Sequence, residues 1–171
     1  MEMVRFDGEN ESFTALEENW QKQCAKFGES FDEFAVPSIA HAREICNGTI
    51  PSPKYGIYGL KSRDNFECLA HINVARLPKT SGITMRVVWV LLAPIYDFSD
   101  ATPDQLAQVA ASLFSNIILL AKGKGDPIMA SDHIKVHLSG LGDRRFFEGM
   151  AWALPEYEVA IRGNWLHMDS R

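Results

Sequence analysis

Apolar positions recur along the chain in two periods, and together they predict an order of helices and strands. Spacings of three and four predict helices over residues 12–27, 31–46, 102–121 and 144–154. Shorter apolar runs predict strands over residues 55–60, 66–76, 83–93, 133–138 and 157–168, with a break near Gly163 in the last. Residues 1–11 are polar and acidic, and they predict a loose lead-in.

The connections between these elements predict the sheet. Two short polar turns join the first three strands, which favours an antiparallel meander. The third strand then reaches the strand at 133–138 through the helix at 102–121, which is the pattern of a right-handed parallel crossover. The sequence therefore predicts one α+β domain over residues 1–171, with a mixed sheet and helices on both faces.

The stretch from 83 to 118 contains the clearest local signals. Its apolar run ends at Pro94. After a short connection, Thr102 is a suitable N-cap and Pro103 suits the first helical position. Because the N-terminus of a helix carries a partial positive charge and free N–H groups, this helix start is a candidate anion site.

Composition narrows the class of protein. The chain has 171 residues, a formal charge of −5 and an estimated pI of about 5.5, with 46% hydrophobic and 23% charged residues. An acidic chain without a Lys/Arg block is not expected to bind nucleic acid. The N-terminus lacks the pattern of a signal peptide, and no apolar run approaches the length of a membrane span, so we expect a cytoplasmic protein without membrane contact.

The sequence gives little support for a metal site or for a reactive or disulfide-bonded cysteine. The three cysteines, Cys24, Cys46 and Cys68, include no CxxC pair and are expected to be reduced thiols. His133 and His137 are four residues apart on a predicted strand, too far apart to hold one metal. The sequence also contains no GxSxG, Walker A, GxGxxG or HExxH motif.

Two segments carry a family resemblance: Val90-Leu-Leu-Ala-Pro94, and Arg145-Phe-Phe-Glu-Gly-Met-Ala-Trp152. With the element order, over about residues 12–169, they resemble the GNAT acyltransferase superfamily. The resemblance implies that acyl-CoA enters between the fourth and fifth strands of the fold. It also implies that backbone N–H groups at the next helix start hold the pyrophosphate, and that the acyl group passes to an amine.

The resemblance also implies where a site would lie, although it leaves the catalytic residues unassigned. The expected cofactor-side residues are Leu91, Leu92, Phe98, Ser99 and Thr102. The expected acceptor-side residues are Tyr58, Arg86 and Trp89. The acceptor would be a small molecule or peptide that carries an amine.

The sequence departs from the family pattern at two positions. The turn at 95–102 has no glycine or basic residue and contains Asp97 and Asp100, while Phe147 stands where the family has a tyrosine. Three hypotheses follow: a divergent acyl-CoA-dependent N-acyltransferase, a GNAT-like binding or interaction module, or a different α/β or α+β enzyme. A homodimer is a further prediction, with the aromatic C-terminal strand around Trp165 as its candidate contact.

Overall fold

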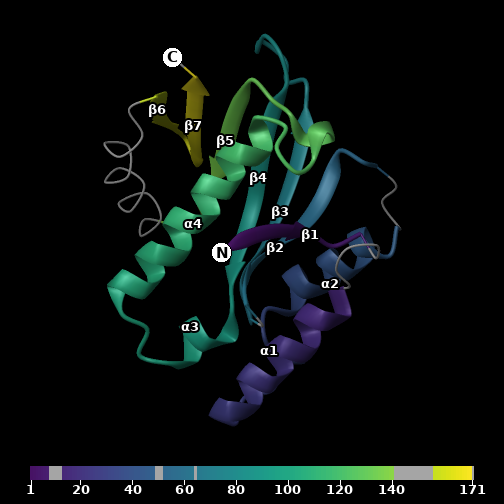
Figure 1. The fold of residues 1–171 in the computed structure, drawn as a ribbon, viewed down its shortest axis with the longest axis vertical. Helices are drawn as coiled ribbons and strands as arrows, with labels where there is room; N and C mark the ends of the chain where they lie inside the picture. Colours follow the sequence, from purple (N-terminus) through teal and green to yellow (C-terminus); the bar gives the residue numbers. More distant parts are fainter. Residues whose placement is uncertain (8–12, 49–51, 64, 141–155, 171) are drawn as a thin grey trace. The chain divides into compact units, whose positions relative to one another are not determined.

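A computed structural model describes residues 1–7, 13–48, 52–63, 65–140 and 156–170 (Figure 1). The predicted helix at 144–154, with Phe147, lies outside the described residues. The helical elements are α1 (Phe13–Phe27), α2 (Val36–Cys46), α3 (Pro94–Phe98), α4 (Pro103–Ala121) and the 3-10 turn η1 (Pro127–Met129). The strands are β1 (Glu2–Arg5), β2 (Tyr55–Ser62), β3 (Asn65–Ala75), β4 (Thr84–Leu92), β5 (His133–His137), β6 (Tyr157–Arg162) and β7 (Trp165–Ser170).

Within the described residues the strands form a seven-stranded mixed sheet in the order β1-β2-β3-β4-β5-β7-β6. The β1–β2, β5–β7 and β6–β7 pairs are antiparallel, and β4 pairs with β5 in parallel. The predicted α+β class is therefore confirmed, as is the parallel connection from β4 through α4 to β5.

The parallel ladder between β4 and β5 is short. It runs from Thr84 opposite His133 to Val87 opposite Val136. The ladder covers four of the five residues of β5, which ends at His137, while β4 continues to Leu92. On its other edge β5 pairs with β7 along its whole length, from His133 opposite Asp169 to His137 opposite Trp165.

The chain forms two compact units, and β3, β4 and α4 each contribute to both. The first unit comprises residues 1–71 and 90–117. Its core includes Leu16 and Trp20 of α1, both fully buried. The Trp20 indole Nε1 donates a hydrogen bond of 2.9 Å to the carbonyl of Phe66, so the polar atom of this large side chain is satisfied inside the core.

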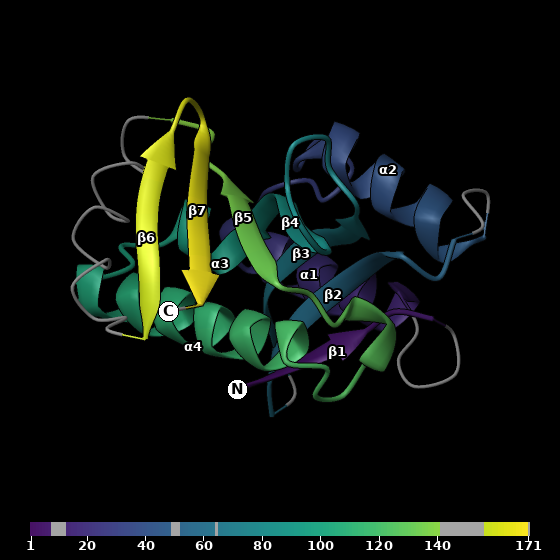
Figure 2. The ribbon, with the colours of Figure 1, turned by 90° about the horizontal axis from the view of Figure 1, so that it is seen from above.

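The second unit comprises residues 72–89 and 118–171. There β6 and β7 form a hairpin around Gly163, whose φ of 61° suits a tight turn (Figure 2). The predicted break near Gly163 is confirmed. Because β7 lies between β5 and β6, both of its edges are paired and are not open to a second copy of the chain. The other half of the predicted C-terminal strand, β6, is the last strand of the described sheet, and the homodimer stays a prediction.

Two local predictions were wrong. Residues 2–5 are not a loose lead-in, because β1 pairs with β2 in the register Glu2–Lys61 to Arg5–Tyr58. The connection after β4 is not a plain turn either, because residues 94–98 form the helix α3. Both elements depend on contacts with distant residues, which the local pattern does not contain.

Helix α4 has the length and composition of a membrane span, contrary to the expectation that no segment approaches one. The most apolar 18-residue stretch of this helix has a mean hydropathy of 1.3, and 33% of that stretch is buried. Core helices of soluble proteins pass the same test. Val109, Leu113 and Ile117 form a buried side of α4. The polar side chain of Asn116 on the same helix accepts a hydrogen bond of 3.1 Å from the backbone N–H of Met3.

Candidate functional site

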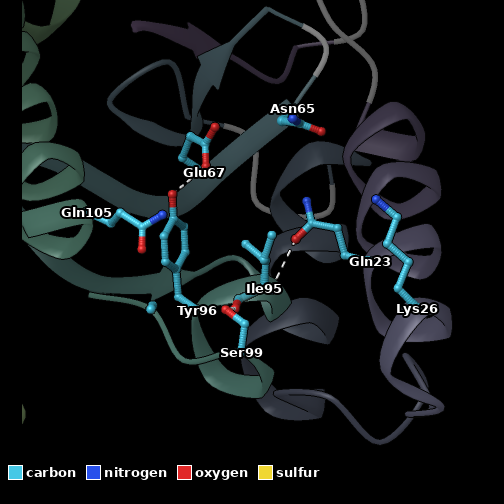
Figure 3. A pocket seen from close by; sticks show the side chains of 9 residues that line it. Gln23, Lys26, Asn65, Glu67, Ile95, Tyr96, Ser99 and Gln105 are labelled. Carbon is cyan, nitrogen blue, oxygen red and sulfur yellow. Dashed lines mark hydrogen bonds between the residues drawn. The ribbon is translucent and has the colours of Figure 1, made fainter. Parts of the chain in front are cut away.

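A pocket of about 200 Å³ lies beside α3 in the first unit (Figure 3). We call it the α3 pocket. It lies just beyond the carboxyl end of β4, a common place for ligands in sheets with parallel strands. Most of its lining side chains are polar: Gln23 and Lys26 of α1, Asn65 and Glu67 of β3, Ile95, Tyr96, Ser99 and Ala101 in and after α3, and Gln105 of α4.

Helix α3 owes its start to a side chain from α1. Pro94 occupies the first turn, where its missing N–H costs nothing. The next N–H, that of Ile95, donates to Oε1 of Gln23 at 3.2 Å. Gln23 is only 6% exposed, so its carboxamide acts as a buried cap supplied from 72 positions earlier in the chain.

The other end of α3 is held by aromatic packing. The Phe98 ring lies 5.8 Å from the ring of Phe34 and 6.2 Å from that of Phe27, measured between centroids. Tilted aromatic pairs at these distances are favourable. Phe98, which was expected on the cofactor side, therefore anchors α3, and it does not line the α3 pocket.

The pair of Tyr96 and Glu67 is the chemical centre of the α3 pocket. The Tyr96 hydroxyl donates a hydrogen bond of 2.7 Å to Oε2 of Glu67, and Figure 3 shows the phenol pointing at the carboxylate. Burial, followed by the hydrogen bond and the negative charge of Glu67, raises the pKa of Tyr96 well above its usual range. The phenol therefore stays protonated and donates its hydrogen bond to the carboxylate.

The remaining polar groups of the pocket are neutral except for one exposed cation, Lys26 on α1. Asn65 and Gln105 contribute carboxamides, and the Ser99 hydroxyl donates to the carbonyl of Ile95. Glu67 is the acidic residue among the lining side chains. A small molecule with hydrogen-bond donors, such as an amine, suits this arrangement.

The start of α4 is closed by its own side chains. The backbone N–H of Thr102 donates to Oε1 of Gln105 at 2.9 Å, and the N–H of Gln105 donates to the Thr102 hydroxyl at 3.3 Å. This reciprocal arrangement is a capping box. Pro103 has no N–H, so a bound anion would have to displace the box to reach most of the helix start.

The acidic turn before α4 does not fit a pyrophosphate. Asp97 and Asp100 are both exposed, and neither lines the α3 pocket. Two carboxylates at this helix start would repel a phosphate group, and the capping box already uses the N–H groups of Thr102 and Gln105. No placement of the cofactor phosphates at this turn follows from the described residues.

The expected cofactor-side residues are only partly brought together. Ser99 lines the α3 pocket. Leu91 and Leu92 are half-buried at the end of β4, and Thr102 is exposed in the capping box, so none of these three lines the pocket. Their contact with a cofactor stays a prediction.

The expected acceptor-side residues lie in different units. Tyr58, in the first unit, is 2% exposed, and the guanidinium of Arg5 lies 5.8 Å from its ring centroid. Arg86 and the half-buried Trp89 belong to the second unit, where Nε of Arg86 donates to Oδ1 of Asn73 at 2.8 Å. A role for these residues at an acceptor site stays a prediction.

Sequence reasoning missed Gln23, Glu67 and Tyr96. Alternation along residues 65–75 could have placed Glu67 on one strand face with Asn65, His71 and Asn73. Its pairing with Tyr96 has no local signal, because 29 positions separate the two residues.

Comparisons with known proteins were made by sequence and by structure. No family model and no curated protein matches the sequence. Similar solved structures include a proposed GNAT-family acetyltransferase from Desulfovibrio desulfuricans, 15% identical, covering 98% of this chain and 95% of that one, with a TM-score of 0.46. Another is the PaiA N-acetyltransferase of Thermoplasma acidophilum in complex with coenzyme A, 11% identical, covering 100% and 99%, with a TM-score of 0.42. These neighbours are of the family that the sequence resembles, and no residue roles transfer at such identities.

Proposed function

We propose that this chain transfers an acyl group from a coenzyme A thioester to a small amine bound in the α3 pocket. The hydrogen-bonded pair of Tyr96 and Glu67 is the observation that carries this proposal. The mixed sheet and the parallel β4–β5 ladder support the reaction class, since the GNAT resemblance implies both. Fold alone does not fix an activity, so the pair must supply the chemistry.

The two side chains have complementary roles in this proposal. The Glu67 carboxylate binds the ammonium form of the acceptor and takes its proton, which leaves a nucleophilic amine. Protonation of Glu67 removes its negative charge, which adds to the effect of burial on the pKa of Tyr96. The phenol would then give its proton to the departing thiolate sulfur and recover one from Glu67, so that the proton taken from the amine leaves on the thiol. The thioester, when bound, supplies the activated acyl carbon.

The size of the pocket favours a small acceptor over a peptide. A volume of about 200 Å³ is below the ~300–1,000 Å³ typical of sites for drug-sized ligands. Glu67 and the neutral carboxamides offer acceptors for the hydrogens of an ammonium group. We therefore propose a small primary amine as the acceptor.

A second candidate function is amine binding without acyl transfer. The closed start of α4 favours it, because the capping box and the acidic turn leave no fitting place for a pyrophosphate there. In this alternative the α3 pocket still binds the amine through Glu67, and the chain acts as a binding module.

Ligand-induced stabilisation separates the two functions. A ligand that binds the native state raises the melting temperature. We expect acetyl-CoA at millimolar concentration to raise it, and a panel of small primary amines to yield an acylated product detected by mass spectrometry. An amine-induced shift without an acetyl-CoA shift or product would favour the binding module. No shift with any amine would exclude the α3 pocket from both functions.

The variant Glu67→Gln tests the pocket directly. It keeps the size of the side chain and removes the charge, so the amine-induced shift and any turnover should disappear. Glu33→Gln is the matched control, because Glu33 is an exposed carboxylate that does not line the pocket. Equal effects of the two variants would mean that overall charge, not Glu67, determines binding.

We also propose a cytoplasmic location. The three cysteines are free thiols in the structure, and burial raises the pKa of Cys68 to about 12, so this thiol is unreactive near neutral pH. Free thiols are usual in a reducing compartment.

A further inference from the structure

A second polar surface lies in the second unit, on one face of β5, β7 and β6. These strands run side by side, as Figure 2 shows in green and yellow. Alternate residues Ile134, Val136, Leu166 and Met168 are at most 3% exposed and form the buried face. The residues between them are half-buried or exposed. We call the following set the basic face: Lys135, His137, Arg162, Trp165 and His167.

The strand register brings these side chains together. Lys135 is directly opposite His167, and His137 is directly opposite Trp165, with 5.0 Å between their ring centroids. Trp165 is also paired with Arg162 of β6, the strand on the other edge of β7. Side chains of directly paired residues project to the same face of a sheet. On β4, Arg86 pairs with Lys135 and adds a further cation beside this group.

The positive charges of the basic face are only partly compensated by the carboxylates that the structure describes. Among the described residues, neither Lys135 nor Arg162 forms an ion pair. Asp169 of β7 is the closest carboxylate along the strand, and its Oδ1 already accepts from Nδ1 of His133 at 2.6 Å. Glu158, opposite Asp169, lies at the same end. The carboxylates therefore gather at one end of the three strands and the cations at the other.

The titration of His167 agrees with this geometry. Burial, followed by the positive charges of Lys135 and Arg162, lowers the pKa of His167, and Asp169 opposes the effect. Like charges directly opposite on neighbouring strands destabilise a sheet. A cluster of cations in a chain of net charge −5 therefore carries a cost that a bound anion would relieve.

We propose that the basic face binds the phosphate group of a small molecule, with Lys135 and Arg162 as its principal ligands. A phosphate dianion offers oxygens to the ammonium, the guanidinium and a ring N–H of His167 at the same time. The half-buried Trp165 and His137 provide an adjoining aromatic surface for the rest of the ligand. The residues of this site belong to the second unit, whereas those of the α3 pocket belong to the first.

Histidine and tryptophan ring signals in NMR spectra test the proposal. Sodium phosphate should shift the signals of His137, His167 and Trp165 in a saturable manner, while sodium chloride at equal ionic strength should not. The affinity for phosphate should fall about tenfold or more in Lys135→Gln and in Arg162→Gln, because each removes a charged donor. Lys124→Gln is the matched control, an exposed lysine of the same unit away from the basic face.

The identity of the ligand is tested with three further probes. AMP should bind more tightly than inorganic phosphate if the aromatic surface contributes, and adenosine should not bind. Malonate binding as tight as that of phosphate would overturn the choice of phosphate. Shifts that chloride reproduces, or that Lys124→Gln weakens as much as Lys135→Gln, would overturn the site. Glu67→Gln should leave phosphate binding unchanged, so failure here is distinguishable from failure of the amine site.

Discussion

The α3 pocket and the basic face are proposed binding sites that differ in shape and in charge. The pocket is concave, and its hydrogen-bonded pair of Tyr96 and Glu67 is half-buried between a strand and a short helix. The basic face carries several cations on paired strands. In the pocket, partial burial makes a single carboxylate influential, because water screens it less. On the basic face, the proposed binding depends on several charges that act together.

After the loss of binding and turnover expected from Glu67→Gln, the largest effect should come from Tyr96→Phe. Loss of the hydroxyl should lower kcat about a hundredfold or more while KM for the amine changes little, because Glu67 still binds the ammonium. Steady-state kinetics with the best amine of the panel checks this split. An unchanged kcat would remove Tyr96 from the chemistry and leave Glu67 as a binding group.

The next largest effect concerns the support of the pocket. Phe98→Ala should lower the free energy of unfolding by about 2–4 kcal/mol, because it removes ring contacts with Phe34 and Phe27. Chemical denaturation measures the loss. Amine binding should weaken, and phosphate binding on the basic face should not. Equal weakening of both would show that the two sites depend on one common scaffold.

A smaller effect is expected from the buried cap. Gln23→Ala leaves the Ile95 N–H without its acceptor, which should cost about 1–2 kcal/mol of stability. Gln23→Glu retains an acceptor and serves as the paired variant. Hydrogen exchange at the Ile95 amide should be faster in the alanine variant than in the glutamate variant. Equal exchange rates would show that packing, not the cap, holds α3.

The smallest effect is a pH dependence in the second unit. The hydrogen bond to Asp169, together with a second from Nε2 to the carbonyl of Ser81 at 2.6 Å, raises the pKa of His133 above 6.5. The protonated ring thus contributes stability that is fully present below pH 6.5 and is lost as the pH rises through the raised value. Unfolding measured from pH 6 to 9 should show this decline in the native chain, with a flatter profile in His133→Gln. Parallel profiles would contradict it.

The elements that could be predicted from the sequence are those whose residue pattern lies within a single segment of the chain. The apolar run of β4 and the Thr102–Pro103 start of α4 are of this kind, and both lie within one or two residues of the expected bounds. Helix α3 could not be predicted in this way, because its N-terminal cap comes from Gln23 and its last residue packs on Phe34. Strand β1 likewise exists through its pairing with β2.

The two candidate sites also differ in how far a local sequence pattern could predict their residues. Lys135 and His137 could be placed on one strand face from alternation alone, although their neighbours on β6 and β7 required the register. Glu67 and Tyr96 gave no signal, since neither belongs to a motif and tertiary folding alone brings them together. The family resemblance indicated the end of β4 as the region of interest, and Ser99 is the expected residue that lines the pocket there.

The capping box of α4 has a further consequence, because the Gln105 side chain belongs both to the box and to the lining of the pocket. Oε1 of Gln105 receives both the backbone N–H and the hydroxyl of Thr102, at 2.9 and 3.2 Å, while the Gln105 side chain also lines the pocket. If the proposed amine binds to the Gln105 carboxamide, it competes with this cap and loosens the first turn of α4. Deuterium uptake at the Thr102 amide would then report whether the pocket is full, without any label on the guest.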